Sequence, residues 1–187
     1  MKECDAMEPI NGDMGMEDVF KIDSKEKLVD FLADQLDSLI DDSWPYVDLT
    51  DQTVGVHLDS AYSGFDDDEM LDGHEIVDIE RVSPREGFTV MERFAQSRQG
   101  KERDKLLRVL SRRHPFRAFR SEAQYLGILQ EWYDFKNKAY EEFAEERLDD
   151  ADVDFVDGRI VCTNPKNIQV VVAEKDDDED EDEDEDE

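Results

Sequence analysis

Strand-type patterns stand on both sides of a long block of helix-type patterns, and this order most constrains how the chain can fold. Short segments rich in β-branched and aromatic residues occur at 44–58 and 75–82, and again at 153–173. Between them, residues 84–149 place apolar side chains at helical spacing. Strands and helices that occur in separate runs favour an antiparallel sheet. The order therefore predicts an α+β fold, with a small antiparallel sheet and a helical layer packed on one face. We expect the segments 44–58, 75–82 and 153–173 to form that one sheet and the helices of 84–149 to cover it.

The boundaries of the expected helices follow from capping residues and helix breakers. Apolar spacing predicts a first helix that begins near residue 24 and ends by residue 43. Ser83 followed by Pro84 predicts the start of a second helix, because serine caps a helix and proline fits its first position. A third helix is expected at 101–113. Pro115 predicts the start of a further helical turn. The longest apolar stripe, which includes Tyr125, predicts a single helix over 122–149.

Several residues are expected in the core or in a tight turn. Phe116 and Phe119 are three residues apart, and Trp132 lies on the apolar stripe of the longest helix. We expect all three rings to be structural and to point at one core. Asp157 followed by Gly158, between two β-forming segments, predicts a hairpin with a type I′ turn.

Charge is distributed very unevenly along the chain. The net charge is −31, yet twelve of the 22 Lys and Arg residues lie within 81–120. That stretch holds only four acids, so its own net charge is +8. The last twelve residues, 176–187, are all acidic. Such segregation gives information about binding partners rather than about the fold.

The basic stretch contains the candidate site. Four arginines surround Phe116 and Phe119: Arg112, Arg113, Arg117 and Arg120. Guanidinium groups fork onto phosphate or carboxylate, so this segment is a candidate anion-binding or partner-binding face. In an alternative interpretation, Arg117 and Arg120 form ion pairs with acids on neighbouring helices. Nucleic acid is not an expected partner, because the net charge of −31 repels it.

Sequence motifs that would carry a reaction are not found. The chain has no glycine-rich phosphate loop and no G-x-S-x-G nucleophile motif. The histidines, His57, His74 and His114, lack the spacing of metal ligands. The acidic run 66–69 lacks the ligand pattern of a calcium loop. The sequence therefore predicts no metal and no cofactor, and it specifies no catalytic residue.

The expected organisation is one folded domain with unstructured ends. We expect an irregular arm at 1–17, a single α+β domain at 18–174 and a disordered acidic tail at 175–187. Cys4 and Cys162 indicate reduced thiols rather than a disulfide framework. No secretory signal is evident, and no apolar run approaches the roughly 20 residues of a membrane helix. A cytoplasmic protein without membrane contact is expected, and the oligomeric state stays open.

Four segments are similar to a known family. Residues 115–119 read PFRAF and residues 131–135 read EWYDF, while 81–95 and 46–49 carry weaker likenesses. Over about residues 24–150 the chain resembles a family of uncharacterised bacterial proteins. The resemblance implies an α+β cytosolic domain, and it implies no activity, cofactor or catalytic residue.

Two functions are compatible with these features. The first is a non-enzymatic acidic adaptor or regulatory protein that binds a protein partner. The alternative is an enzyme or small-ligand binder with a phosphate or carboxylate pocket at residues 112–120. An exposed basic or apolar patch would favour the first, whereas a deep pocket with titratable groups of shifted pKa would favour the second.

Overall fold

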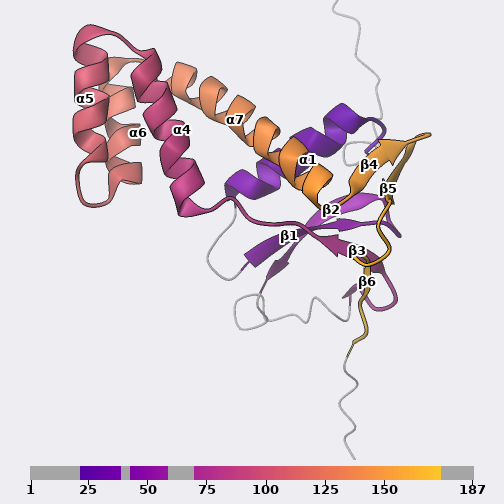
Figure 1. Ribbon diagram of the computed structural model, residues 1–187. Coiled ribbons are helices and arrows are strands. Elements are labelled where there is room, and N and C mark those ends of the chain that lie inside the picture. Colours follow the sequence, from indigo (N-terminus) through magenta and orange to yellow (C-terminus); the bar gives the residue numbers. More distant parts are fainter. Residues whose placement is uncertain (1–21, 39–42, 59–69, 174–187) are drawn as a thin grey trace, which may run out of the picture.

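The computed structural model describes residues 22–38, 43–58 and 70–173 (Figure 1). The expected N-terminal arm, the acidic run 66–69 and the acidic tail lie outside these residues. In chain order the elements are α1 (Lys25–Ser38), β1 (Ser43–Asp48), β2 (Thr53–Leu58), β3 (Glu75–Asp78), α4 (Pro84–Ser97), α5 (Gly100–Leu110), α6 (Pro115–Leu126), α7 (Leu129–Asp150), β4 (Val153–Val156), β5 (Arg159–Cys162) and β6 (Gln169–Val170).

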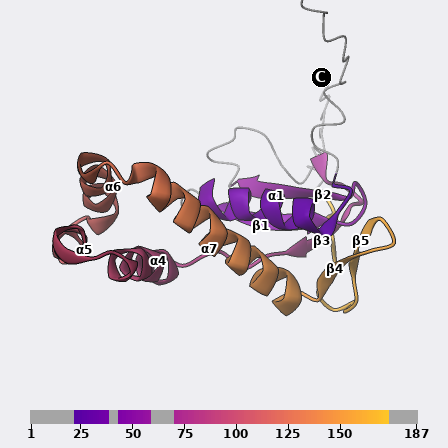
Figure 2. The same ribbon diagram turned by 90° about the horizontal axis from the view of Figure 1, so that it is seen from above.

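A four-stranded sheet confirms the α+β fold. Its strand order is β2-β1-β3-β6, and every neighbouring pair is antiparallel. Val47 on β1 stands opposite Val54 and Val77, and these valines belong to one apolar cluster together with buried Leu28 and Leu32 of α1. Figure 2 shows α1 lying along the sheet with α7 beside it. This is the expected helical layer on one face of a small sheet.

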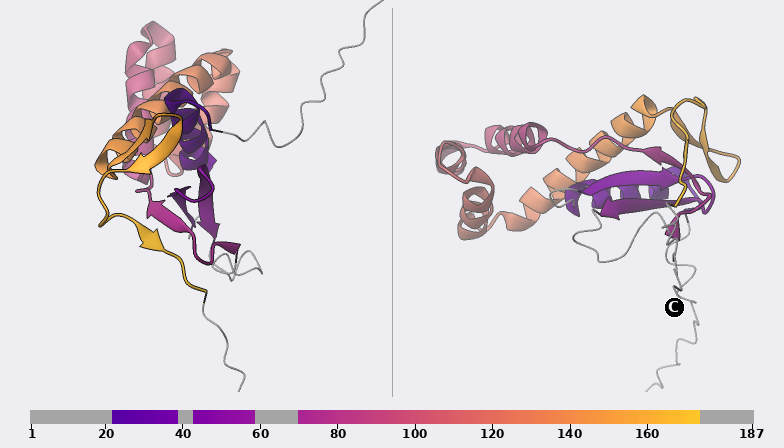
Figure 3. Two further views of the ribbon diagram at one scale, coloured as in Figure 1. Left: turned by 90° about the vertical axis from the view of Figure 1, so that its right-hand side faces the viewer. Right: turned by 90° about the horizontal axis from the view of Figure 1, so that it is seen from below.

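The remaining helices form a second core. Its buried members are Val90, Met91, Phe94, Ala95, Leu106, Val109, Leu110, Phe119, Ala123, Ile128, Trp132 and Ala139. We had placed all helices of 84–149 on the sheet. Instead α4, α5 and α6 bury their apolar faces against one another and against the first half of α7, and stand away from the sheet (Figures 1 and 3).

The molecule is therefore built from two lobes joined by one helix. We call α4, α5, α6 and residues 129–139 of α7 the helical lobe. We call α1, the four-stranded sheet, residues 140–150 of α7 and the β4–β5 hairpin the sheet lobe. Trp132 of α7 lies in the core of the first lobe, and Ala144 and Leu148 lie in the core of the second. Because α7 contributes to both cores, it fixes how the lobes meet.

The expected single helix over 122–149 is wrong, because the chain turns at Gly127. This residue adopts the left-handed conformation, with φ of 74°. Its N–H donates to the carbonyl of Gln124 at 3.1 Å, and the N–H of Ile128 donates to the carbonyl of Ala123 at 3.0 Å. The two bonds form a Schellman motif, which ends α6 and lets α7 start in a new direction.

The predicted helix cap at Ser83 and the predicted hairpin turn at Asp157–Gly158 are confirmed. Ser83 caps α4, and Glu86 returns a hydrogen bond to the Ser83 N–H at 2.7 Å, which completes a capping box. Asp157 and Gly158 both have positive φ, as a type I′ hairpin turn requires. The β4–β5 hairpin forms its own two-stranded sheet, however, and we had expected it to extend the main sheet.

Candidate binding cleft and basic end

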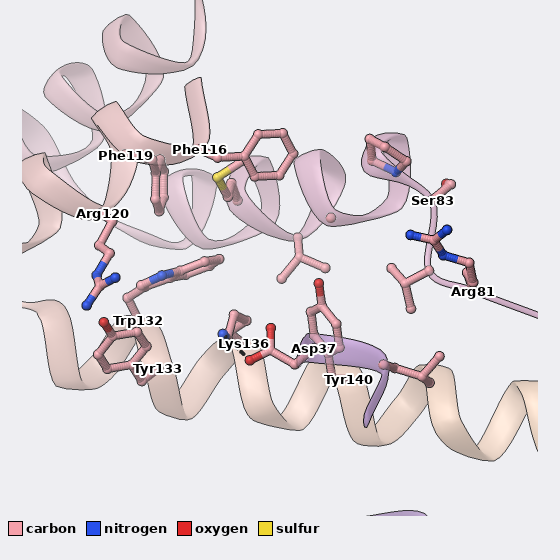
Figure 4. A pocket seen from close by; sticks show the side chains of 16 residues that line it. Asp37, Arg81, Ser83, Phe116, Phe119, Arg120, Trp132, Tyr133, Lys136 and Tyr140 are labelled. Carbon is pink, nitrogen blue, oxygen red and sulfur yellow. Dashed lines mark hydrogen bonds and ion pairs between the residues drawn. The ribbon is translucent and has the colours of Figure 1, made fainter. Parts of the chain in front are cut away.

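A cleft of about 590 Å³ lies where the two lobes meet. Its walls come from α4, α6 and α7, from the last turn of α1, and from the connection ahead of α4 (Figure 4). Ligand sites in proteins commonly have volumes of about 300–1,000 Å³, so this cleft can hold a small ligand or a side-chain anchor.

Aromatic rings form much of the cleft wall. Phe119 and Trp132 are buried, as expected, with ring centroids 4.9 Å apart and nearly perpendicular planes. The expectation that Phe116 is a core residue is wrong, because its side chain is 48% exposed at the cleft. Phe116 lies in the first turn of α6 and faces Gly87 of α4, which has no side chain to cover the ring.

Lys136 and Asp37 join the lobes at the cleft. Their Nζ and Oδ2 atoms are 2.6 Å apart, and this ion pair connects α7 to the end of α1. The Lys136 ammonium also lies 5.7 Å from the ring centroid of Tyr133 and 5.8 Å from that of Tyr140. The ammonium is therefore already neutralised, and it is a weak candidate for receiving an external anion.

Tyr140 contributes a hydroxyl to the same cleft. Burial, and then the negative charges of Asp37 and Glu86, raise the pKa of Tyr140 to about 12. The phenol therefore stays protonated well into the alkaline range and can donate a hydrogen bond. With its aromatic faces, this hydroxyl and the guanidinium of Arg120, the cleft has the chemistry of a binding site for an anionic group that carries an apolar portion.

Arg120 is the one residue of the predicted arginine set that lines the cleft. Its guanidinium carbon lies 5.9 Å from the ring centroid of Tyr133. Arg112 and Arg113 lie in the turn between α5 and α6, and Arg117 lies on α6. All four are exposed. The structure therefore brings the four together along one turn and one helix, and does not enclose them in a single pocket.

The unpaired cations extend beyond these four. Among the described residues, seven exposed Lys and Arg residues of α5, α6 and the turn between them form no ion pair within 4.0 Å. They are Lys101, Arg103, Arg108, Arg112, Arg113, Arg117 and Arg120. We call this set the basic end. Within the described residues, Arg117 and Arg120 therefore form no ion pair with a neighbouring acid, contrary to the alternative interpretation.

Nearby cations outside the basic end do have acidic partners. Arg98 contacts Glu102 at 3.2 Å and Glu131 at 2.7 Å, and Lys105 contacts Glu122 at 3.8 Å. The helical lobe therefore contains acids within reach of some cations. The cations of the basic end are therefore unpaired within the described part of the chain, although α5 and α6 themselves carry the acids Glu102, Asp104 and Glu122.

A buried ion pair holds the helical lobe against the sheet lobe. Arg147 of α7 has a side chain only 7% exposed, and it contacts Glu86 of the α4 capping box at 2.6 Å. Burial alone would raise the pKa of Glu86, but hydrogen bonds with Ser83 and Arg147 outweigh it and hold the pKa below its ordinary value. The Glu86 carboxylate thus completes the cap at the start of α4 and also links α4 to α7 through an ion pair.

One cluster of possible metal ligands was not predicted from the sequence. Pairing of β1 with β3 brings His74 to Asp48, and the ligand atoms of Asp48, Asp51 and His74 lie within 4.8 Å of one another. Asp48 is buried, but both its oxygens have protein partners: the N–H groups of Thr50 and Asp51, and the His74 ring at 2.7 Å. Asp48 thus stabilises the turn that follows β1. The absence of metal binding stays a prediction.

Comparisons with known proteins add no constraint. No family model, no curated protein and no solved structure matches the chain. The resemblance to uncharacterised bacterial proteins therefore stays a prediction. Within the described residues, none of the helices is both long enough and apolar enough to cross a membrane.

Proposed function

We propose that this protein is a non-enzymatic adaptor or regulatory protein that binds an acidic segment of a partner protein through the basic end. The supporting observation is the set of seven exposed cations that have no acidic partner within the described residues. An isolated positive region on a chain with net charge −31 attracts anionic groups locally, while the rest of the chain repels them. Charge thus orients the partner as well as attracting it.

The length of the basic end favours an extended partner over a small anion. Its cations come from α5, the following turn and α6, and of the four arginines at 112–120 only Arg120 lines the cleft. A single phosphate can contact only a few such groups, whereas a run of Asp and Glu can follow them. The overall charge of −31 disfavours a long polyanion such as duplex DNA, because most of its length would face negative surface.

The proposal is tested with a fluorescent oligoglutamate peptide and the full-length chain. Fluorescence anisotropy is expected to show binding that weakens steeply as NaCl is raised. The double variant Arg113→Glu with Arg117→Glu is expected to weaken binding about tenfold or more, as loss of two or more charge contacts implies.

The matched control is Lys138→Glu with Arg159→Glu. Both residues are exposed, form no ion pair within the described part of the chain, and lie outside the basic end. The control changes the net charge by the same amount, so its binding should stay close to that of the unaltered chain. Equal weakening in both variants would contradict the assigned surface. Tight binding of inorganic phosphate with none of the peptide would favour the small-ligand alternative.

A further inference from the structure

The cleft and the basic end share a helix. Phe116 and Arg120 are four residues apart on α6, so they lie on the same side of it, and both line the cleft. Arg120 also belongs to the basic end and has no acidic partner within the described residues. An anion-binding group and an exposed aromatic ring are therefore presented next to each other.

Resting on the proposed function, we infer that the cleft receives an aromatic anchor of the partner. The partner segment is an acidic peptide in which one Phe, Tyr or Trp enters the cleft beside Phe116. Its carboxylates then lie along Arg120 and Arg117 toward the turn that carries Arg113. This chemistry combines an apolar contact, which supplies affinity, with charge contacts, which supply orientation.

Gly87 is the first observation that carries this inference. It lies inside helix α4 without a positive φ, so the backbone does not require glycine there, and glycine destabilises a helix relative to alanine. A Cβ atom at this position would lie 3.5 Å from Cε1 of Phe116 and 3.7 Å from the Tyr140 hydroxyl. Both are ordinary contact distances, so a methyl group fits here, and the further atoms of a longer side chain would have to enter the cleft beside Phe116 and Tyr140.

The composition of the wall is the second observation. Phe116 and Phe119 approach from α6, and Trp132, Tyr133 and Tyr140 approach from α7 (Figure 4). Aromatic rings pack favourably against one another in edge-to-face and offset arrangements, so this wall suits an aromatic side chain better than an aliphatic one. Three cations line the cleft. Lys136 is occupied by Asp37, and Arg81 lies at the opposite end from Arg120 (Figure 4), which leaves Arg120 as the cation beside the aromatic wall that meets the carboxylate.

The test compares two labelled acidic peptides that differ at one central residue, Phe in one and Ala in the other. The full-length chain should bind the Phe peptide about tenfold more tightly, as burial of a large apolar side chain implies. Gly87→Leu should abolish this difference, because leucine fills the cleft, while the Ala peptide keeps its affinity. Its melting temperature should not fall by a large amount, since leucine favours a helix more than glycine does.

The matched control is Gln96→Leu, an exposed position on the same helix that does not line the cleft. It should keep the preference for the Phe peptide. If Gly87→Leu fails to fold, Phe116→Ala serves instead, because a half-exposed ring contributes little to the core and its loss should still reduce the preference.

The outcomes separate the two proposals. Equal affinity for both peptides, or a Phe preference that survives both Gly87→Leu and Phe116→Ala, would overturn the anchor while leaving the basic end in place. Failure of the Ala peptide to bind would overturn the proposed function itself. If phenylacetate binds as tightly as the Phe peptide, the cleft is a small-ligand site and the inference is wrong.

Discussion

The two lobes distribute their unpaired cations differently. In the sheet lobe, Lys25 contacts Asp154 at 2.8 Å, Lys27 contacts Asp23 at 2.8 Å, and buried Arg147 contacts Glu86 across the junction. In the helical lobe, the seven exposed cations of the basic end are concentrated on α5, α6 and the turn between them, and they have no such partner within the described residues. In the sheet lobe, Arg159 is an exposed cation of this kind, but no comparable group of them forms among its described residues. The same types of side chain thus mainly stabilise contacts in one lobe and stay available as a group at one end of the other.

This difference shows why net charge alone is a poor guide to partners. A value of −31 for the whole chain indicates a protein that repels anions. The screening distance at physiological salt is only about 8 Å, however, so a bound group responds mainly to nearby charges. An anionic segment at the α5–α6 turn therefore meets the arginines there and not the average of the molecule.

The largest expected effect concerns the core of the helical lobe. Phe119→Ala should lower the free energy of unfolding by about 3–5 kcal/mol, because the ring is fully buried against Phe94 and Trp132. Phe116→Ala should cost less than about 1.5 kcal/mol, because its ring is half exposed. Urea denaturation measures both. Equal losses would mean that Phe116 belongs to the core and not to the cleft opening.

This pair of phenylalanines illustrates what the sequence could predict. Pro115 correctly indicated that a helical turn begins there, although α6 extends well beyond one turn, and the Ser83–Pro84 and Asp157–Gly158 pairs correctly placed a cap and a turn. These signals are local, because each depends on the backbone preferences of adjacent residues. The exposure of Phe116 depends instead on Gly87, which is distant in sequence and close in space.

The wrong predictions also arise from contacts between residues that are distant in sequence. The apolar spacing continues across Gly127, so the sequence predicts a single helix with Tyr125 on its buried face. The structure breaks the helix there, and Tyr125 is 78% exposed. Likewise, the contact of His74 with Asp48 depends on the pairing of β1 with β3. The division into two cores depends on how the helices pack. No short segment of sequence encodes either arrangement.

The second prediction concerns the junction between the lobes. Glu86→Gln should lower stability at neutral pH by about 1–3 kcal/mol, because it removes the carboxylate that contacts the buried Arg147 guanidinium at 2.6 Å and leaves it only the longer contact with Glu146 at 3.6 Å. Since the pKa of Glu86 is lowered in the folded protein, its contribution is present above its unfolded value of about 4.5. That contribution is lost as the pH falls through the lower folded pKa.

The check is urea denaturation at several pH values. The unaltered chain should lose stability on acidification more steeply than Glu86→Gln does. Glu92→Gln provides the control on the same helix, because Glu92 forms no ion pair within the described residues. If the two variants behave alike, the Glu86–Arg147 pair does not hold the lobes together.

A smaller effect is expected from reversing charges within the helical lobe. Arg113→Glu with Arg117→Glu should change the free energy of unfolding by less than about 1 kcal/mol, because neither side chain has an acidic partner within the described part of the chain. Arg98→Glu should cost more, because it replaces contacts with Glu102 and Glu131 by repulsion. Thermal unfolding of the three proteins separates these cases. A large loss in the double variant would show that the basic end is structural.

The smallest expected effect is contact between the acidic tail and the basic end. The chain leaves the described region after β6, on the far side of the sheet lobe from α5 and α6 (Figure 3). The fourteen residues beyond Ala173 can span at most roughly 50 Å when fully extended, which limits how far an intramolecular contact can reach. Salt screens exposed opposite charges, so any such contact should be transient, and a contact between copies should grow with protein concentration.

At low salt, the NMR shifts of residues 98–120 should differ slightly between the full chain and a chain ending at Lys175. The difference should vanish near 0.5 M salt, where the screening length is well below about 10 Å. Identical spectra at every concentration would show that the tail does not reach the basic end, which would then be open to a partner without competition.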